Sequence, residues 1–438
     1  MIRQSLLSFI SVVALGTAAQ AHETREFPAR LAGHAELPAQ TFVAPPTDAP
    51  VSLNVSGRFT DGERSEALYA IRNADTGLGM PFPGQPLQGF SGIRSLGDGR
   101  FLVMIDNGFG NSRNSSDAML MFGIVEADWT TGQVAIEETI FLSDPNRAVP
   151  FPIVNEHTEG RYLTGADFDP ESIQPLGDHY WIGDEFGPWL IEVDAKGVVQ
   201  RVFASDAGGE LLQSPDNFFV NTPNPGDSLP DSVRVFRSGG YEGMALDEDG
   251  TTLYPLLEKP LWMPEEGTVE TLDGIPVLRM FEFDTVSGEW GDTLRYYPLE
   301  DASHAIGDFN LIEGTRALII ERDARQGDPR IAEFTDPVQF KRLYLVDLER
   351  TDENGVLEKI AHIDLMKIED PDGVAPRGTV NGVFTFPFVT IENVDRVDET
   401  TIVVANDNNY PFSVGREPGR VDDNEFILLD VADFLNAR

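Results

Sequence analysis

Hydrophobic residues occur along this chain in short runs separated by turns rich in glycine and aspartate, a pattern that predicts β-hairpins. The clearest pair of runs is Ser172–Leu176 and His179–Gly183, joined by a Gly-Asp turn. Glu171 precedes the first run, and Asp184 and Glu185 follow the second. Because the start of one strand lies beside the end of its antiparallel partner, we expect these three carboxyl groups to cluster at one edge of the sheet.

The same order of features occurs four more times: a polar or acidic residue, a short strand, a turn, a hydrophobic strand and another polar or acidic residue. The hydrophobic strands of these copies are Phe101–Ile105, Thr252–Leu257, Ala317–Ile320 and Thr401–Ala405. In the five first strands, the equivalent residues are Gly92, Ser172, Gly243, Asn310 and Asn393. Further strand-like runs follow the hairpins, among them Met119–Val125, Leu190–Val193, Val277–Phe283 and Leu343–Val346.

Four strands per unit, repeated around an axis, are typical of a β-propeller. The predicted fold class is therefore all-β, a β-propeller with five clear blade units, and Arg58–Ala70 could supply a sixth. The C-terminal unit has only three clear strands, the last at Glu425–Leu429. The N-terminal stretch, with possible strands at Arg30–Glu36 and Thr41–Val43, is expected to supply the missing outer strand and close the ring. No long helix is predicted, and Val431–Asn436 forms at most a short turn.

Residues 1–21 have the features of a secretory signal peptide: Arg3, the apolar run Leu6–Ala19 and an A-x-A cleavage motif ending at Ala21. The apolar run is too short for a membrane span, and no second long run follows. We therefore expect cleavage after Ala21, a periplasmic or secreted location, and a single propeller domain over residues 22–438. The chain has no cysteine, so disulfides do not stabilise it.

The chain carries 73 acidic and 32 basic residues, which gives a formal net charge of −41. Such a charge repels nucleic acid and anionic membranes and attracts divalent cations. Solvated surface charge on an acidic secreted protein is the alternative interpretation. That alternative does not explain why acids recur at the ends of the predicted hairpins.

In a propeller, the acidic ends of the five hairpins would meet at one mouth of the central channel. Hard oxygen ligands suit Ca²⁺, with another divalent cation as the alternative. The candidate metal ligands are Asp106, Asp169, Asp184, Glu321, Glu392 and Asp407. Neighbouring carboxylates raise one another's pKa, so a glutamate there could act as a general acid or base. The candidate catalytic residues are Glu171, Glu185, Glu242 and Glu258.

Basic residues lie near these acids and could bind an anionic group of a small-molecule substrate. The candidates are Lys259, Arg322 and, in the loop 144–170, Arg161. Pairing with the neighbouring acids is the alternative for Lys259 and Arg322. The chain contains no G-x-S-x-G, H-E-x-x-H or Walker A motif, and its six histidines are scattered. The sequence does not indicate an oligomeric state.

Several segments resemble the bacterial phytase-like family, which is described as having esterase-like activity. They are Leu163–Ser172 (LTGADFDPES), Trp181–Trp189 (WIGDEFGPW), Tyr241–Leu246 (YEGMAL) and Ile391–Val394 (IENV), together with Glu321–Asp323 (ERD). The resemblance extends over roughly residues 50–430. It implies a secreted propeller hydrolase that acts on phosphoric esters, phytate included.

The resemblance also implies that recurrent aspartates and glutamates are the working residues. The matching positions are Asp167, Asp169, Glu171, Asp184, Glu185, Glu242, Glu258, Glu321, Asp323, Glu392 and Asp407. The first unit departs from the pattern, because it has Ser91-Gly92 where other units carry a glutamate.

Three functions remain open from the sequence. The first is Ca²⁺-assisted hydrolysis of phosphoric esters by the acids at the channel mouth. The second is metal-dependent hydrolysis of carboxylic esters or lactones on the same scaffold. The third is a non-catalytic propeller that binds a cation or another ligand.

Overall fold

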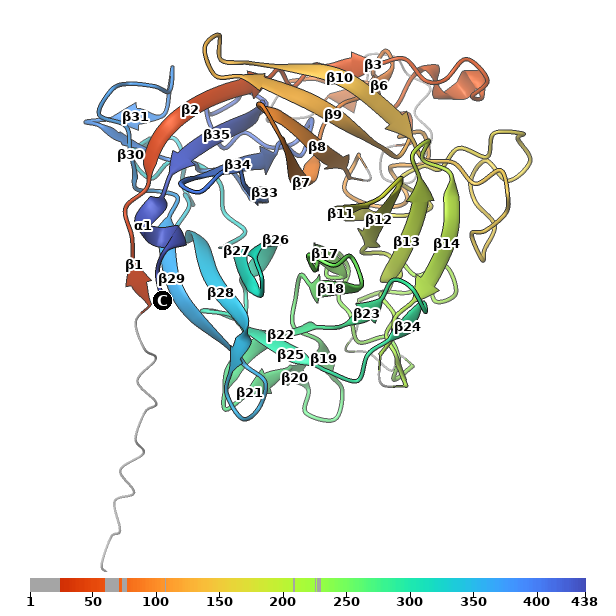
Figure 1. Ribbon diagram of the computed structural model, residues 1–438. Helices are drawn as coiled ribbons and strands as arrows, with labels where there is room; N and C mark the ends of the chain where they lie inside the picture. Colours follow the sequence, from red (N-terminus) through yellow and green to blue (C-terminus); the bar gives the residue numbers. More distant parts are fainter. Residues whose placement is uncertain are drawn as a thin grey trace, which may run out of the picture.

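The computed structural model describes residues 24–59, 71–72, 77–106, 108–207, 209–224, 226 and 230–438. All five predicted hairpins are present, and they supply the inner two strands of five sheets. Their first strands contact one another in the closed order β7, β11, β17, β26, β33 and back to β7. Figure 1 shows these strands around the central axis. The fold is an all-β propeller, as the hairpin repeat predicts.

The first two sheets each contain four antiparallel strands in chain order. The first sheet consists of β7 (Phe90–Gly97), β8 (Arg100–Ile105), β9 (Met121–Asp128) and β10 (Gln133–Phe141). The second consists of β11 (Pro170–Leu176), β12 (His179–Asp184), β13 (Trp189–Asp194) and β14 (Val199–Ala204).

The third and fourth sheets carry additional short strands. The third contains β17 (Tyr241–Leu246), β18 (Thr252–Leu257), β22 (Ile275–Met280) and β25 (Arg295–Pro298), with β21 (Thr271–Leu272), β23 (Phe283–Asp284) and β24 (Glu289–Trp290). The run predicted at Val277–Phe283 is thus divided between β22 and β23. The fourth contains β26 (Ala305–Glu313), β27 (Arg316–Arg322), β28 (Lys341–Thr351), β29 (Leu357–Asp364) and the parallel strand β1 (Arg25–Glu26).

The last sheet closes the ring as predicted. It contains β33 (Thr390–Arg396), β34 (Thr401–Asp407) and β35 (Asn424–Asp430), and β2 (Arg30–Leu37) adds the outer strand antiparallel to β35. A single pairing between Gln133 and Glu36 also joins β2 to the first sheet, and β30 (Ile368–Glu369) pairs with β2 at Arg30. The first and last sheets are therefore hydrogen-bonded to each other.

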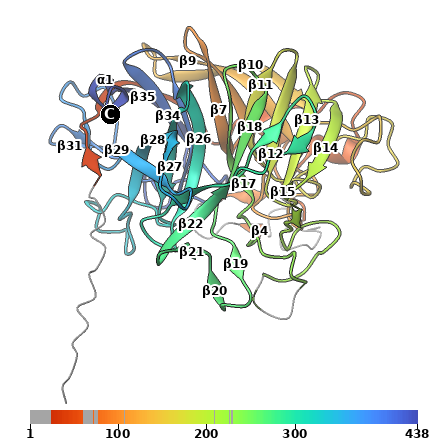
Figure 2. The same ribbon diagram turned by 60° about the horizontal axis from the view of Figure 1, so that its bottom comes forward.

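Short elements lie between the sheets and at their edges. They are β3 (Phe42–Val43), β4 (Ile71–Arg72), β5 (Gly79–Met80), β6 (Gln85–Pro86), β15 (Asp206–Ala207), β16 (Glu210–Leu211), β19 (Trp262–Met263), β20 (Thr268–Val269), β31 (Thr379–Val380) and β32 (Val383–Phe384), with a 3₁₀ turn at Val51–Asn54 and helix α1 at Ala432–Leu435. Figure 2 shows β4, β15, β19 and β20 on one face of the ring. Within the described chain, no helix has the length and apolar character needed to cross a membrane.

The core consists of apolar clusters packed between neighbouring sheets. Between the first two sheets, for example, buried Phe122 of β9 belongs to the same cluster as Ile173 and Ile182 of the second hairpin. Between the last sheet and the first, Phe426 of β35 packs against Phe90 and Phe101. Burial of a side chain of this size stabilises a fold by roughly 1.5–3 kcal/mol. Packing between sheets therefore holds the ring together without disulfides.

Two expectations concern residues outside the described part of the chain. The signal peptide, residues 1–21, lies there completely. Of the sixth unit suggested at Arg58–Ala70, the structure describes only Arg58 and Phe59.

Candidate functional site

A β-bulge interrupts the first strand of each hairpin near its start. The register skips Glu171 in β11, Glu242 in β17 and Glu392 in β33. A bulge redirects the side chain of the extra residue, and all three glutamates line one cavity at this end of the channel. In β26 the skipped residue is Gly307, and β7 skips Ser91-Gly92, so two hairpins contribute no glutamate at this level.

The sequence alignment of the fourth hairpin was wrong by two residues. Asp308, not Asn310, follows the bulge and pairs with Ile320, as Ser172 pairs with Gly183 in the second hairpin. A second bulge, between Leu311 and Glu313, lengthens β26. Residues of β26 that are counted back from the turn are therefore out of step with the corresponding residues of the other hairpins.

The second strand of each hairpin ends in a position that faces the same cavity. In each hairpin, a residue pair lies directly beyond the bulge, towards the open end. The next residue of the second strand after this pair is, in the five hairpins in turn, Asp106, Glu185, Glu258, Arg322 and Asp407. All five of these residues line the cavity. Successive side chains along a strand point to opposite sides, so the preceding residues, such as Asp184 and Glu321, do not line it.

The cavity has a volume of about 210 Å³ and is strongly acidic. Its eight carboxyl groups belong to Asp106, Asp169, Glu171, Glu185, Glu242, Glu258, Glu392 and Asp407. One guanidinium, that of Arg322, shares the cavity with them. Sequence reasoning missed four further lining residues, Gly110, Ser238, Thr390 and Asn409, which carry no charge and belong to loops or to the first position of β33.

Arg322 binds acids from two other hairpins. Its Nη2 atom donates to Oε1 of Glu392 at 2.7 Å and to Oε1 of Glu258 at 3.0 Å. Its buried Nε–H has no partner among the described residues. On the opposite side of Glu392, the Ser91 hydroxyl donates to Oε2 at 3.3 Å. The guanidinium therefore fixes part of the acidic wall and keeps one donor for a further acceptor.

Lys259 lies beside the cavity without lining it. Its ammonium group is 2.8 Å from Oε2 of Glu258 and donates to the backbone carbonyl of Ser238. Burial alone would lower the pKa of Lys259, but Glu258 and Glu185 raise it, so the side chain stays charged. The pairing with a neighbouring acid, expected as the alternative, is thus present.

Two overlapping groups of carboxylates could hold a metal ion. Asp169, Glu171 and Glu185 form one group, and Glu171, Glu242 and Glu392 form the other, each with ligand atoms within 4.8 Å of one another. Glu185 and Glu242 are 3% and 2% exposed, and Oε1 of each lacks a hydrogen-bond donor among the described residues. Buried acceptors of this kind are costly unless a proton or a cation satisfies them. The hard oxygen donors fit Ca²⁺ or Mg²⁺.

Burial raises the pKa of most of these carboxyl groups above the ordinary range. For Glu171 the further causes are the charges of Asp169 and Glu242, and for Glu242 they are those of Glu392 and Glu258. Burial and Glu392 together raise the pKa of Asp407 to about 8. Burial also raises the pKa of Asp106, Glu185 and Glu392. These raised pKa values mean that the cluster retains protons near neutral pH, and cations would compete with them.

Three candidate residues lie outside the cavity with partners of their own. Asp184 accepts hydrogen bonds from the backbone N–H groups of Asp169 and Gly187, both at 2.7 Å, and so fixes the loop after β12. Arg161 donates to Asp144 at 2.8 Å and to the Glu156 carbonyl at 3.1 Å within its own loop.

Glu321 is fully buried on the outer side of β27. It accepts hydrogen bonds from Lys359 at 2.7 Å, His304 at 2.8 Å and Tyr297 at 3.0 Å. Burial alone would raise the pKa of Glu321, but Lys359 and His304 lower it. The carboxylate is therefore ionised, and its oxygens are occupied by these hydrogen bonds. Two other family-matching acids, Asp167 and Asp323, accept backbone N–H bonds in loops and do not line the cavity.

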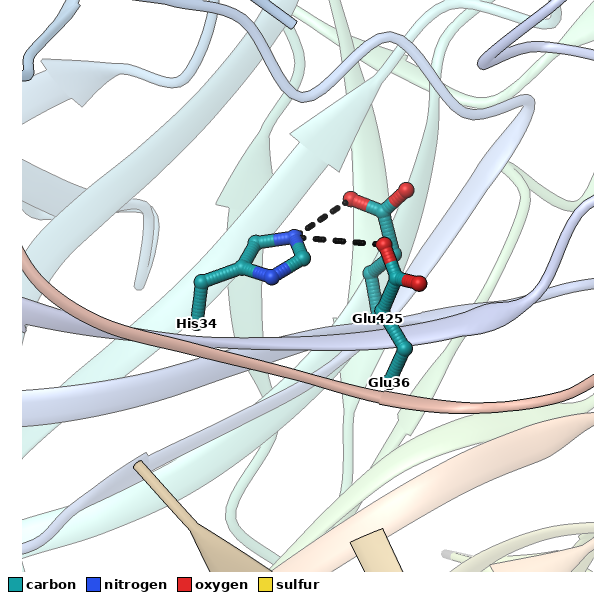
Figure 3. A group of neighbouring side chains, drawn as sticks. All are labelled: His34, Glu36 and Glu425. Carbon is teal, nitrogen blue, oxygen red and sulfur yellow. Dashed lines mark hydrogen bonds and ion pairs between the residues drawn. The ribbon is translucent and has the colours of Figure 1, made fainter. Parts of the chain in front are cut away.

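A third acidic group lies in the last sheet, where His34 faces Glu36 and Glu425 (Figure 3). Nε2 of His34 is 3.2 Å from Oε2 of Glu425 and 3.8 Å from Oε1 of Glu36. Both Glu425 oxygens already accept from Arg416, at 2.8 and 2.6 Å. This group is an ion-pair network that ties β2 to β35.

Comparison with known proteins gives one family match. A family model described as "Phytase-like: Esterase-like activity of phytase" matches residues 85–410. No curated protein matches the sequence.

Solved structures resemble the chain only distantly. A luciferin-regenerating enzyme is 11% identical, with 77% of this chain and 76% of that chain covered and a TM-score of 0.32. The WD40 β-propeller domain of Doa1 is 11% identical, with 78% and 93% covered and a TM-score of 0.29. A member of the DUF4221 family from Bacteroides vulgatus is 9% identical, with 93% and 99% covered and a TM-score of 0.33. These values permit no conclusion about function.

Proposed function

The chain belongs to the phytase-like family, and from this membership we propose that it is a cation-dependent hydrolase of phosphoric esters. The observation that supports the proposal is the acidic cavity, in which eight carboxyl groups and Arg322 from five hairpins meet. A family description that names esterase-like activity supports hydrolysis of an ester bond in general. The phosphoric ester and the cation go beyond that description and rest on the acidic cavity.

The cation would be held by the two sets of three carboxylates described above, which have Glu171 in common. Asp169, Glu392 and the neighbouring Asp106 and Asp407 complete the acidic wall around them. A bound divalent cation neutralises phosphoryl charge and makes water a better nucleophile at neutral pH. Ca²⁺ suits a site with this many carboxylate oxygens better than Mg²⁺, which demands a stricter octahedral geometry.

The chain's own residues would orient the ester and transfer protons. Arg322 has a buried Nε–H that no described residue accepts, and this donor suits an anionic phosphoryl oxygen. Lys259 adds positive charge beside Glu258. Glu171, Glu185 and Glu242 have raised pKa values, so one of them can accept or donate a proton at neutral pH, and Glu258 is the fourth candidate.

The test is a panel of phosphoric monoesters and diesters assayed with and without Ca²⁺. We expect phosphate release that a chelator abolishes and added Ca²⁺ restores. Glu171→Gln and Glu242→Gln should reduce kcat/KM by about 100-fold or more. Full activity in both variants would remove these residues from the mechanism.

Hydrolysis of a carboxylic ester or lactone is the second candidate, because the family description names an esterase-like activity. A cation in the same cavity would polarise a carbonyl as it would a phosphoryl group. Parallel assays with an aryl acetate and a lactone distinguish this function from the first. Tight cation binding without turnover of any ester would instead identify a binding propeller.

We also propose that the protein acts outside the cytoplasm, on the basis of the signal sequence in residues 1–21. N-terminal sequencing of the protein recovered from cells should begin at His22. A chain that retains Met1 would contradict export by this route.

A further inference from the structure

A groove lies on the loops next to the acidic cavity. Two hollows, of about 540 and 340 Å³, share Ser112, Arg113, Asp216 and Asn221 and therefore form one groove. Its size is that of ordinary small-molecule sites.

The groove and the acidic cavity are neighbours along the chain at three places. Gly110 and Ser238 line the cavity, and the adjoining Asn111 and Arg237 line the groove. Glu185 lines the cavity, and the next residue, Phe186, lines the groove. The same loops thus contribute to the walls of both, which places the groove beside the cavity, within reach of a ligand that has one group in each.

One part of the groove is aromatic. Phe151, Phe186, Trp189 and Phe218 line it. Phe151 is buried and stacks on Phe218, with ring centroids 5.0 Å apart and planes at 11°. Phe218 is 48% exposed, although it lies on a loop fixed by hydrogen bonds from Asn217 to the Gly187 carbonyl and from Ser214 to the Phe186 carbonyl. A fixed, half-exposed aromatic ring backed by a buried one is a surface suited to an apolar ligand group.

The charges of the groove suit a ligand with few negative charges. Arg237 is paired with Asp216. Arg113 is exposed, and its charge acts on the same Asp216. One exposed guanidinium does not neutralise a polyanion, and a chain of net charge −41 repels one.

Building on the proposed function, we propose that this groove binds the organic group of the ester, and that the substrate is a phosphoric ester of an apolar, alkyl or aryl, alcohol. The phosphoryl group lies in the acidic cavity, Arg113 contributes positive charge at the groove, and the apolar group packs on Phe218. This specificity differs from that for inositol polyphosphates, whose ring carries several phosphates and no apolar surface.

The test uses alkylphosphonates with one to eight carbons, which cannot be hydrolysed, and measures their binding by calorimetry in the presence of Ca²⁺. Affinity should rise roughly threefold per methylene over part of the series, because each buried methylene adds apolar contact. Wild-type affinity that does not depend on chain length would overturn the proposal.

Two variants locate the effect. Phe218→Ala should flatten the dependence on chain length while methylphosphonate binds as before. The control is Val286→Ala, since Val286 is 78% exposed, follows β23 in the third sheet and does not line the groove; it should keep the wild-type slope. Equal flattening in both variants would place the apolar contact elsewhere and contradict the proposal.

A third variant tests the charge. Arg113→Ala should weaken every phosphonate by a similar factor of roughly two to five, and an unchanged affinity would exclude Arg113 from the site. None of these measurements needs turnover. A protein that hydrolyses no ester but shows the chain-length dependence would retain the groove as a ligand site and lose the proposed function.

Discussion

Arg322 donates a 2.7 Å hydrogen bond from Nη2 to Oε1 of Glu392, and this bond joins β27 to β33 across the acidic cavity. Arg322 occupies the position at which the other four hairpins carry Asp106, Glu185, Glu258 and Asp407. A single cation of the protein itself is thus built into a ring of acids. Its removal should change cation binding and substrate binding in opposite directions.

Arg322→Met removes one positive charge from the wall of the cavity. We expect Ca²⁺ to bind roughly tenfold more tightly, because less positive charge opposes it at short range. We expect kcat/KM on the best phosphoric ester to fall about 100-fold, because a donor to the phosphoryl group is lost. Calorimetry and steady-state kinetics measure the two effects.

Arg325→Met is the control for this prediction, because Arg325 pairs with the exposed Asp336 at 2.8 Å and does not line the cavity. Its Ca²⁺ affinity and kcat/KM should equal those of the wild type. A loss of Ca²⁺ affinity in Arg322→Met would show that the guanidinium organises the ligands more than it repels the ion.

Glu171 belongs to both carboxylate groups, whereas Glu392 belongs to only one. Glu171→Gln should therefore weaken Ca²⁺ binding at least about tenfold, and by more than Glu392→Gln does. Titration calorimetry on metal-free protein measures both variants. Glu313→Gln serves as the control, since the Glu313 side chain is 65% exposed and lies at the end of β26 that is farther from the bulge at Gly307. Equal affinities in the wild type and Glu171→Gln would place the cation elsewhere.

The position of the acidic residues at hairpin ends follows from the sequence, but the identity of those that face the cavity does not. Asp184 and Glu185 are adjacent acids, and the acid Glu321 is likewise adjacent to the basic residue Arg322. Strand alternation places Glu185 and Arg322 in the cavity and turns Asp184 and Glu321 away. Deciding between neighbours requires the register, and one residue of error reverses the answer.

The bulges explain the other differences between the site predicted from the sequence and the site in the structure. Glu171 enters the cavity because the pairing of β11 with β12 skips it. A hydrophobic pattern does not reveal such a skip, and the second bulge in β26 displaced our alignment to Asn310. The closing strand at Arg30–Glu36 was predictable because the C-terminal unit lacked an outer strand, and an open sheet edge must be covered.

Stability in acid should depend on Glu425. Burial alone would raise its pKa, but Arg416 and His34 lower it to about 2, from an ordinary value of 4.5. A carboxyl group with a lowered folded-state pKa stabilises the fold above pH 4.5, and this contribution disappears as the pH falls towards 2. The melting temperature of the wild type should therefore fall across this window.

In Glu425→Gln the melting temperature should depend less on pH between 4.5 and 2. The variant should also lose about 3–5 kcal/mol of stability at pH 7, because Arg416 is left buried without its anion. Asp430→Asn, an exposed change at the end of β35, provides the comparison. An unaltered acid profile in Glu425→Gln would assign the acid sensitivity to other carboxylates.

Removal of β2 should prevent stable folding. A chain that begins at Ala39 lacks Arg30–Leu37 and leaves the edge of β35 unpaired. We expect loss of the cooperative thermal transition and aggregation, because an exposed strand edge pairs with other chains. Circular dichroism and light scattering measure both. A chain that begins at Phe27 keeps this buried core residue, loses the two-residue strand β1 and should melt cooperatively.

The pairing of β2 with β35 links folding to the order of synthesis. β2 leaves the ribosome before any of the five hairpins, and its partner, Asn424–Asp430, leaves it only after all of them. The nascent chain must therefore carry an unmatched strand while all five hairpins are being made. The ring can be completed only after the last sheet has emerged, so the polypeptide stays open until then.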